Sequence, residues 1–275
     1  MDFASVKLVV ADMDGTLLTP EHELPEEFYA VFEKLEARGI LFAAASGRQY
    51  YNILKLFPGL ENKILFIAEN GSYVAYRKEE LLVQAMDKNT ARVQLREARN
   101  FTDVYPILCG KKQAYIDNES PQFLAKMSLY YDRVKVVDDI TAVEDDDFLK
   151  IALCDLNGAE ENTYRHFRKK EGILQVKVSG KIWLDLSDPL ANKGHALRHV
   201  QQHFGISRDE TMAFGDFLND VEMLQESHFS YAMENAHPEV KRVARFKAGS
   251  NNSNGVLNVL RDVVGDSSDY PAITS

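Results

Sequence analysis

The sequence predicts an α/β protein with a doubly wound, parallel, Rossmann-like core sheet and a second, smaller α+β domain inserted into it. Short apolar runs alternate with helical patterns in both terminal parts of the chain, which is typical of βαβ units. Polar residues follow several of these runs directly, as expected where parallel strands end at one edge of a sheet. Between about residues 85 and 186 the alternation stops, and short β-like runs mix with helices.

The first part of the chain, residues 1–84, contains three apolar runs that we expect to form buried strands. These expected strands are residues 6–11, 40–45 and 64–68. Helical spacing of apolar residues predicts two helices, over residues 25–38 and about 49–57. Gly39 follows the first of them as a typical helix stop. A hairpin is expected from residues 73–76 and 81–84.

The inserted segment, residues 85–186, predicts a separate α+β domain. Its expected strands are residues 104–108, 114–117, 149–155 and 181–186. The alternation of apolar and polar residues from Ile182 to Leu186 predicts a half-exposed sheet. Because the insertion divides the core domain into residues 1–84 and 187–275, we expect its two junctions to lie close together.

The βαβ pattern resumes after the insertion. Lys193 opens a helix that Gly205 closes. The remaining expected elements are a strand at 211–214, a helix at 220–226, a strand at 229–232 and a helix at 256–264. The tail, residues 265–275, is polar and is expected to be loose.

Composition restricts the function classes. The net charge of −10 over 275 residues argues against nucleic acid as the main partner. The apolar runs are too short to cross a membrane, and the first residues predict no signal peptide. Two cysteines, Cys109 and Cys154, lie in apolar surroundings, which predicts a reduced, cytoplasmic protein.

Three groups of polar residues and one lysine are expected to share one edge of the core sheet. The first three follow predicted strands and are Asp12 with Asp14, Ser46, and Asp216 with Asn219 and Asp220; the lysine is Lys193, which opens a helix. Several carboxylates without a His or Cys cluster favour Mg²⁺. An ammonium group and a Ser-Gly turn favour a phosphate. The pattern therefore predicts metal-assisted phosphoryl transfer.

These residues resemble the four motifs of the haloacid dehalogenase superfamily. The matching segments are Asp12-Met13-Asp14-Gly15-Thr16, Ser46-Gly47-Arg48, Lys193-Gly194 and Gly215-Asp216-Phe217-Leu218-Asn219-Asp220. Asn70-Gly71, the run from Ala232 to Ala236 and Asn254-Gly255-Val256 are similar to the Cof-type sugar-phosphatase branch. The resemblance covers essentially the whole chain and implies a core with an inserted cap domain, residues 85–186, that would close over the site as a lid and select the substrate.

The resemblance also implies site roles. Asp12 would be the nucleophile that forms an aspartyl-phosphate, and Asp14 the general acid and base. Mg²⁺ would be held by Asp12, the Asp14 carbonyl and Asp216, with Asp220 orienting Lys193 or a metal-bound water.

The phosphoryl group would be held by the Met13 and Gly47 amides, Ser46, Lys193 and Asn219. Arg48 fits a substrate contact as well as a surface salt bridge. Asn70 is interpreted as the start of an Asn-Gly turn.

The function implied is a Mg²⁺-dependent phosphatase acting on small phosphorylated metabolites, sugar phosphates first among them. A phosphomutase on the same scaffold is an alternative, and a phospho-accepting regulatory module is another. The receiver-type module is disfavoured because its phosphorylated Asp ends the third strand, where this chain has Glu69-Asn70. The sequence names neither the physiological substrate nor a protein partner.

Overall fold

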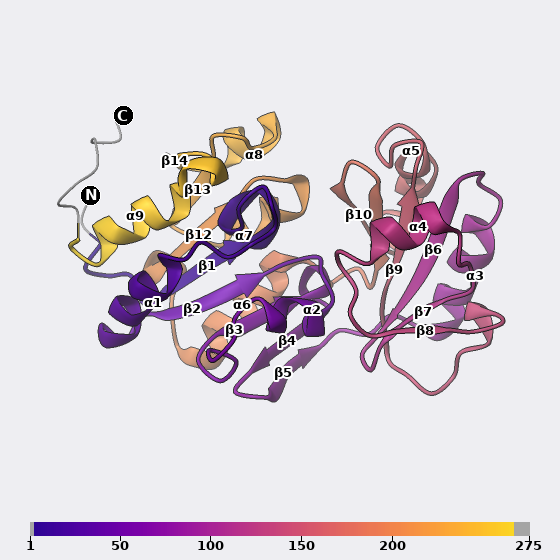
Figure 1. The fold of residues 1–275 in the computed structure, drawn as a ribbon, viewed down its shortest axis with the longest axis horizontal. Helices are drawn as coiled ribbons and strands as arrows, with labels where there is room; N and C mark the ends of the chain where they lie inside the picture. The colour runs from indigo at the N-terminus through magenta and orange to yellow at the C-terminus, as the bar shows by residue number, and fades with distance from the viewer. Residues whose placement is uncertain (1–2, 267–275) are drawn as a thin grey trace.

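The structure, a computed structural model, describes residues 3–266 and contains two β-sheets that lie side by side (Figure 1). The first sheet has eight strands in the order β14-β13-β12-β1-β2-β3-β4-β5. The second has six strands in the order β10-β11-β9-β6-β7-β8. Residues 267–275, most of the tail expected to be loose, lie outside the described part of the chain.

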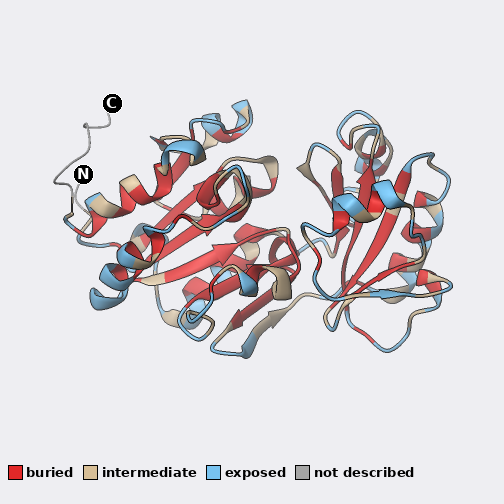
Figure 2. Cartoon of the chain, viewed as in Figure 1, coloured by how far each residue is buried: buried red, intermediate tan, exposed pale blue. Residues whose placement is uncertain are grey.

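The first sheet is parallel from β14 to β3, and β4 and β5 add an antiparallel edge. Its strands are β1 (Leu8–Asp12), β2 (Leu41–Ala45), β3 (Leu65–Ala68), β4 (Tyr73–Tyr76), β5 (Glu79–Val83), β12 (Thr211–Gly215), β13 (Phe229–Met233) and β14 (Phe246–Ala248). Every residue of β1, β3, β12 and β13 is buried, as the continuous apolar runs predict for strands covered on both faces (Figure 2).

Helices cover both faces of this sheet. They are α1 (Phe28–Ala37), α2 (Tyr50–Lys55), α6 (Lys193–Phe204), α7 (Val221–Gln225), α8 (Pro238–Val243) and α9 (Gly255–Val263). On one face Phe28 of α1 packs edge-on against Phe42 of β2 and Phe57 beyond α2. Helices α6 and α7 pack together on the other face. The doubly wound α/β core is therefore confirmed.

The second sheet belongs to the segment between β5 and α6. It contains β6 (Val104–Gly110), β7 (Ala114–Ile116), β8 (Val134–Val136), β9 (Phe148–Asp155), β10 (Gln175–Gly180) and β11 (Trp183–Ser187). Its helices are α3 (Lys88–Ala98), α4 (Pro121–Met127) and α5 (Thr163–Phe167). Helices α3 and α5 pack on one face and α4 on the other. The segment that carries this sheet is called the second unit below.

The expectation of a half-exposed sheet at residues 182–186 is wrong. All five residues of β11 are buried. Leu184 and Leu186 pack beneath α3 and α5, whereas Trp183 belongs to the apolar cluster beneath α4. Asp185, the polar residue of the alternation, contacts the first unit. Alternation indicates a solvent-facing side only where nothing else covers the strand, and here the polar side faces the first unit.

The parallel pairing of β1 with β12 and β2 places the predicted polar residues at one sheet edge. Asp12 pairs in register with Ala45, directly before Ser46, and Ala11 pairs with Phe214, two residues before Asp216. In Figure 1 this edge faces the second unit. The two chain junctions also meet, because Gln84 Nε2 donates to Asp188 Oδ1 at 2.9 Å.

Differences from the sequence expectations are of two kinds: some elements have shifted ends, and others are absent from the expectations. Helix α1 begins at Phe28 rather than at residue 25, because the Phe28 amide closes a turn on the Pro25 carbonyl at 2.9 Å. The elements β8, β10, β14, α3, α4, α5 and α8 were not located by the sequence patterns. Within residues 3–266, no helix combines the length and apolar character that a membrane span requires.

Candidate active site

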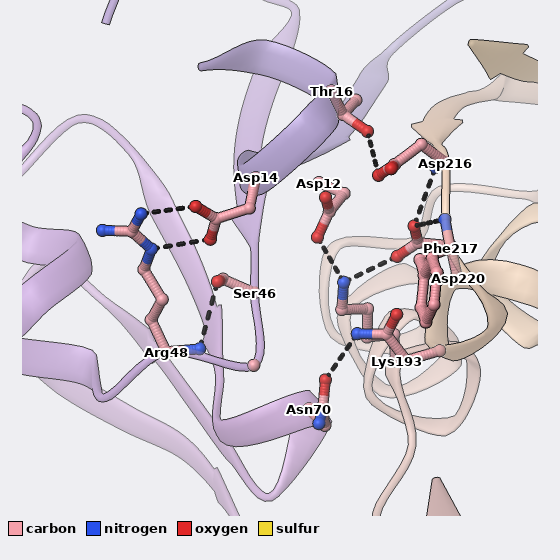
Figure 3. A network of polar contacts seen from close by, with 12 residues as sticks. Asp12, Asp14, Thr16, Ser46, Arg48, Asn70, Lys193, Asp216, Phe217 and Asp220 are labelled. Carbon is pink, nitrogen blue, oxygen red and sulfur yellow. Dashed lines mark hydrogen bonds and ion pairs between the residues drawn. The ribbon is translucent and has the colours of Figure 1, made fainter. Parts of the chain in front are cut away.

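Three carboxylates and one ammonium group form a cluster where β1, β12 and α6 meet; Asp216 is half-buried and the other three are buried (Figure 3). Lys193 Nζ lies 2.5 Å from Asp12 Oδ1 and 2.6 Å from Asp220 Oδ1. The Lys193 side chain is fully buried. Carboxylate oxygens of Asp12, Asp216 and Asp220 all lie within 4.8 Å of one another, so the three acids surround one small space.

Hydrogen bonds to Thr16 and Asp220 hold the loop that carries Asp216 in place. Thr16 Oγ1 donates to Asp216 Oδ1 at 3.0 Å, which ties the loop after β1 to the loop after β12. Asp220 Oδ2 accepts from the backbone amides of Asp216 and Phe217 at 3.0 and 3.1 Å. Gly15 adopts φ +77°, and a Cβ there would lie 2.5 Å from Asp216 Oδ2. The glycine is required both by its backbone conformation and by this close approach.

The cluster carries an excess of negative charge. Three ionised carboxylates and one ammonium group sum to −2. Burial and the Asp220 charge raise the pKa of Asp216 to about 7, against the opposing hydrogen bond from Thr16. Burial and Asp220 also hold the pKa of Asp12 well above its usual range, although Lys193 opposes this. A divalent cation would remove this imbalance, and oxygen donors are the ligands that Mg²⁺ prefers.

Helix α6 places Lys193 at its first position. The Asn192 side chain caps the helix by accepting from the His195 amide at 2.8 Å. At Gly194 a Cβ would lie 2.6 Å from the Glu222 Cβ, so the glycine permits close packing of α6 against α7. A cation at a helix N-terminus is disfavoured by the helix dipole, and here two carboxylates compensate for it.

Asp14 forms a separate, partly exposed cluster with Arg48 and His22. The Arg48 guanidinium binds both carboxylate oxygens of Asp14, with Nε donating to Oδ2 at 2.7 Å and Nη2 donating to Oδ1. His22 Nδ1 lies 2.8 Å from Asp14 Oδ1. Burial alone would raise the pKa of Asp14, but the hydrogen bonds and charge of Arg48, with those of His22, lower it below its usual range. Arg48 is buried, so its ion pair is not a surface salt bridge.

Asn70 is hydrogen-bonded to both Ser46 and Asn219. The Asn219 side chain donates to Asn70 Oδ1 at 2.8 Å, and the Asn70 amide reaches the Ser46 carbonyl at 3.0 Å. Asn70 has φ +55°, which is the conformation expected for its turn. Its side chain Nδ2 also donates to Asp185 of the second unit. Asn70 is therefore both the turn residue predicted and a buried connection within the site.

A cavity of about 630 Å³ opens between the acid cluster and the second unit. Its floor includes Asp12, Asp14, Ser46, Gly47 and Asp216. Its opposite wall comes from the second unit and includes Lys126, Tyr130, Lys150, Lys181, Trp183 and Asp185. The cavity therefore places polar groups of the first unit opposite aromatic and cationic groups of the second.

Most of the site residues predicted from the sequence meet around this cavity. Asp12, Asp14, Ser46, Gly47, Arg48, Asp216 and Asn219 line it. Lys193 and Asp220 lie behind Asp12, fully buried. The Met13 side chain points into the hydrophobic core, so only its backbone is available to a ligand.

Sequence reasoning missed Thr16, Glu69, Lys150 and Asp185. The last two are charged residues within the otherwise apolar runs of β9 and β11. A charge inside a buried strand needs a partner, and this signal was available in the sequence. Their hydrogen-bond partners in the first unit, Gly47 for Lys150 and Asn70 for Asp185, lie 103 and 115 residues away and could not be identified from it.

A family model and a similar protein of known name both relate this chain to one family of hydrolases. A model of haloacid dehalogenase-like hydrolases matches residues 9–260. The chain is 35% identical over 263 residues to the 5-amino-6-(5-phospho-D-ribitylamino)uracil phosphatase of Escherichia coli, covering 94% of this chain and 97% of the relative.

Solved structures show the same fold over both units. A protein of Streptococcus mutans superposes with a TM-score of 0.88 at 26% identity, over 94% of this chain and 99% of that one. A sugar phosphatase of haloacid dehalogenase subclass IIB superposes with a TM-score of 0.82 over 94% of this chain and 98% of that one. Its 21% identity supports the shared fold alone.

Proposed function

The chain belongs to the haloacid dehalogenase superfamily, in its Cof-type branch, and from this premise we propose that it is a Mg²⁺-dependent phosphatase of small phosphorylated metabolites. The observation that carries the proposal is the cluster of Asp12, Asp216, Asp220 and Lys193. Asp12 and Asp216 line the cavity, and Lys193 and Asp220 lie buried behind Asp12. Its charge, its oxygen donors and its position opposite a second unit suit a metal and a phosphate together.

Asp12 is the proposed nucleophile. An oxygen of its carboxylate attacks phosphorus, the bond to the leaving oxygen breaks, and an aspartyl-phosphate forms. Lys193, 2.5 Å from Asp12 Oδ1, offsets the repulsion between the carboxylate and the phosphate. At about 4 Å and an effective dielectric of ~20, that repulsion is roughly 4 kcal/mol per pair of unit charges. Each ~1.4 kcal/mol is a factor of ten in rate, so the compensation is essential.

Asp14 is the proposed general acid and base. It would protonate the leaving oxygen and then take a proton from the water that hydrolyses the intermediate. The pair with Arg48 and His22 favours its ionised form. To act as an acid, Asp14 must first take up a proton from solvent. If bound substrate displaces Arg48 from Asp14, burial would raise the pKa of Asp14 and favour the protonated form that donates to the leaving oxygen.

The residues present fit a magnesium ion. Asp12, Asp216 and the Asp14 carbonyl would hold it, and Asp220 would keep Lys193 in place. When bound, Mg²⁺ supplies positive charge that stabilises the phosphoryl group. Ser46, Lys193, Asn219 and the amides of Met13 and Gly47 would bind the phosphoryl oxygens.

The proposed substrates are sugar or polyol phosphates. Tyr130 and Trp183 contribute aromatic surface to the cavity, with ring centroids 5.5 Å apart, and Lys126 and Lys181 contribute positive charge. Because of the name of the E. coli relative, 5-amino-6-(5-phospho-D-ribitylamino)uracil is the first compound to test. Its planar ring would suit the aromatic wall.

The function is tested by measuring inorganic phosphate released from p-nitrophenyl phosphate and from a panel of sugar and polyol phosphates. We expect turnover with Mg²⁺, none with a chelator, and none for Asp12→Asn. The matched control is Asp145→Asn, which makes the same change at an exposed residue and should leave the rate unchanged. A rate that survives Asp12→Asn would refute the proposal.

The intermediate separates the alternatives. Asp14→Asn should slow its hydrolysis, so that phosphoprotein accumulates from an activated substrate. Stoichiometric labelling of the unchanged protein without turnover would indicate a regulatory module. Transfer of the phosphoryl group to a second position of the sugar, without release, would indicate a phosphomutase.

A further inference from the structure

Lys150 is a buried lysine that reaches from the second unit into the first. It lies on β9, and its side chain is 2% exposed. Its Nζ donates to the Gly47 carbonyl at 2.5 Å and lies 3.1 Å from Glu69 Oε2 and 3.3 Å from Asp185 Oδ2. Burying an ammonium group is costly, so its place in an apolar strand requires these partners.

The contact with Gly47 acts on one peptide group of the phosphate-binding turn, residues 46–49. That peptide group joins the Gly47 carbonyl to the Arg48 amide, and the Arg48 amide donates to Ser46 Oγ at 3.1 Å. An ammonium group on the carbonyl fixes the plane of the peptide and strengthens the hydrogen bond from its N–H. The Arg48 N–H occupies one lone pair of Ser46 Oγ. The hydroxyl proton of Ser46 must therefore point away from the Arg48 amide, which restricts the orientation of the hydroxyl group.

The second unit holds the same turn from another side. Gln49 Oε1 accepts from the backbone amides of Asp132 and Arg133 at 3.1 and 2.9 Å. The Gln49 side chain also donates to the Arg133 carbonyl at 2.9 Å. The phosphate-binding turn is thus held between β9 and the chain that follows α4, and both belong to the second unit.

We propose that Lys150 is a positioning residue that orients Ser46 through the Gly47–Arg48 peptide group, so that the phosphate-binding turn is complete only when the second unit is docked. The inference rests on the proposed phosphatase function. It assigns the second unit a role in binding the phosphoryl group, in addition to contacting the leaving group.

The charge balance around Lys150 is consistent with this role. The carboxylates of Asp185 and Glu69 raise the pKa of Lys150 despite the opposing effect of its burial. Burial raises the pKa of Glu69, against the charge of Lys150. Lys150 therefore stays charged, and its loss would leave the buried carboxylates of Glu69 and Asp185 without a cation and lower the stability of the protein.

The test compares Lys150→Met with the double variant Lys150→Met/Glu69→Gln, in which one of those carboxylates is neutralised. The matched control is Lys177→Met, which removes another ion pair between the units, 2.5 Å from Glu222, without contacting the turn. Each variant is assayed with p-nitrophenyl phosphate and with glucose 6-phosphate. Inorganic phosphate binding is measured by calorimetry with Mg²⁺ present, and thermal unfolding is followed for each.

We expect kcat/KM of Lys150→Met to fall by about 10- to 100-fold, by the same factor for both substrates, because the turn contacts the part they share. Phosphate affinity should fall by about tenfold. The double variant should regain thermal stability without regaining activity or phosphate affinity, and Lys177→Met should stay within about twofold of the wild type.

Three results would overturn the inference: a loss confined to one leaving group, a return of activity together with stability in the double variant, or unchanged phosphate affinity. Failure of the proposed function is distinguishable from these. If the proposed function is wrong, the unsubstituted protein will release no phosphate from any substrate. The difference in phosphate affinity between the wild type and Lys150→Met would still test the role of Lys150.

Discussion

At the scale of single residues, the main feature of the site is that it has fewer positively charged side chains than carboxylates. Lys193 serves both Asp12 and Asp220, and Arg48 serves Asp14. Asp216 has a hydroxyl partner in Thr16. The raised pKa values of Asp12 and Asp216 show that the metal-free site disfavours full ionisation. The carboxylates of Asp12, Asp216 and Asp220 repel one another, and a bound cation would reduce that repulsion.

This imbalance predicts opposite stability effects for two inactivating substitutions. Asp12→Asn should raise the thermal midpoint of the metal-free protein, because it removes one of three crowded buried charges and leaves Lys193 paired with Asp220. Lys193→Met should lower the free energy of unfolding by about 3–5 kcal/mol, because it leaves buried carboxylates unpaired.

Both values are measurable by thermal and denaturant unfolding in a chelator. Asp145→Asn is the control for a surface charge. A metal-free Asp12→Asn protein that melts below the wild type would contradict the charge argument.

At the scale of elements, chain direction and helix caps carry side chains to the site. The ends of β1, β2 and β12 deliver Asp12, Ser46 and Asp216 to one edge. Helix α6 brings Lys193 there because its cap fixes where the helix starts. The Asn192 cap therefore affects more than the stability of α6. If the first turn of the helix shifts, the Lys193 ammonium group shifts with it.

Two cap substitutions separate these consequences. Asn192→Ala removes the acceptor of the His195 amide at the start of α6, and Asp87→Ala removes the acceptor of the Thr90 amide, 2.7 Å away, at the start of α3. Each should cost about 1 kcal/mol of stability. Only Asn192→Ala should also lower kcat, by roughly tenfold, because α3 does not carry a residue of the site.

The measurement is urea unfolding and steady-state phosphate release for both variants. Equal losses of kcat would show that the activity change follows general stability. An unchanged kcat in Asn192→Ala would show that Asp12 and Asp220 hold Lys193 without help from the cap.

At the scale of the whole molecule, the two units meet through polar and apolar contacts around a central cavity. Leu149 of β9 packs into the apolar core of the first unit, and Phe217 and Leu218 pack against that of the second. Besides the contacts of Lys150 and Gln49, Lys177 pairs with Glu222 and Asn70 with Asp185. Both units also have apolar cores of their own. Stability and ligand binding are therefore coupled at the interface between the units, where the polar contacts lie nearest the cavity.

The pKa of Asp216 predicts how that coupling depends on pH. The folded-state value of about 7 lies above the ordinary carboxyl value of ~3.9. Between these values the folded metal-free protein binds more protons than the unfolded chain, so this group's contribution to stability is lost as pH rises through about 7. Mg²⁺ requires the ionised carboxylate, so its stabilising effect should grow over the same range.

Thermal unfolding with excess Mg²⁺ and with a chelator tests this. We expect Mg²⁺ to raise the midpoint by several degrees at pH 8 and by little at pH 5.5; at a hundredfold excess over Kd, the stabilisation is about 2.7 kcal/mol. Asp216→Asn should abolish the difference between the two pH values. An equal rise at both would contradict the assignment of Asp216 to the metal.

Much of this organisation could be predicted from the sequence. The strands that end in Asp12, Ser46 and Asp216 were located because continuous apolar runs stop where polar residues begin, which is a local signal. The helix from Lys193 to Gly205 was predicted for the same reason, since its start and stop residues adjoin it. The short elements β8, β14 and α8 were missed because three to six residues carry too little periodicity to define an element.

The sequence by itself determined which residues the sheet delivers to its carboxyl edge, because burial patterns and strand ends depend on neighbours along the chain. Only the tertiary structure decided that Arg48 faces Asp14, that β11 is buried on both sides, and that Lys150 lies against Gly47. These outcomes depend on docking between surfaces that are remote in sequence. A charged residue in a buried strand indicates that it must have a partner. Which residue that partner is depends on how the two units pack together.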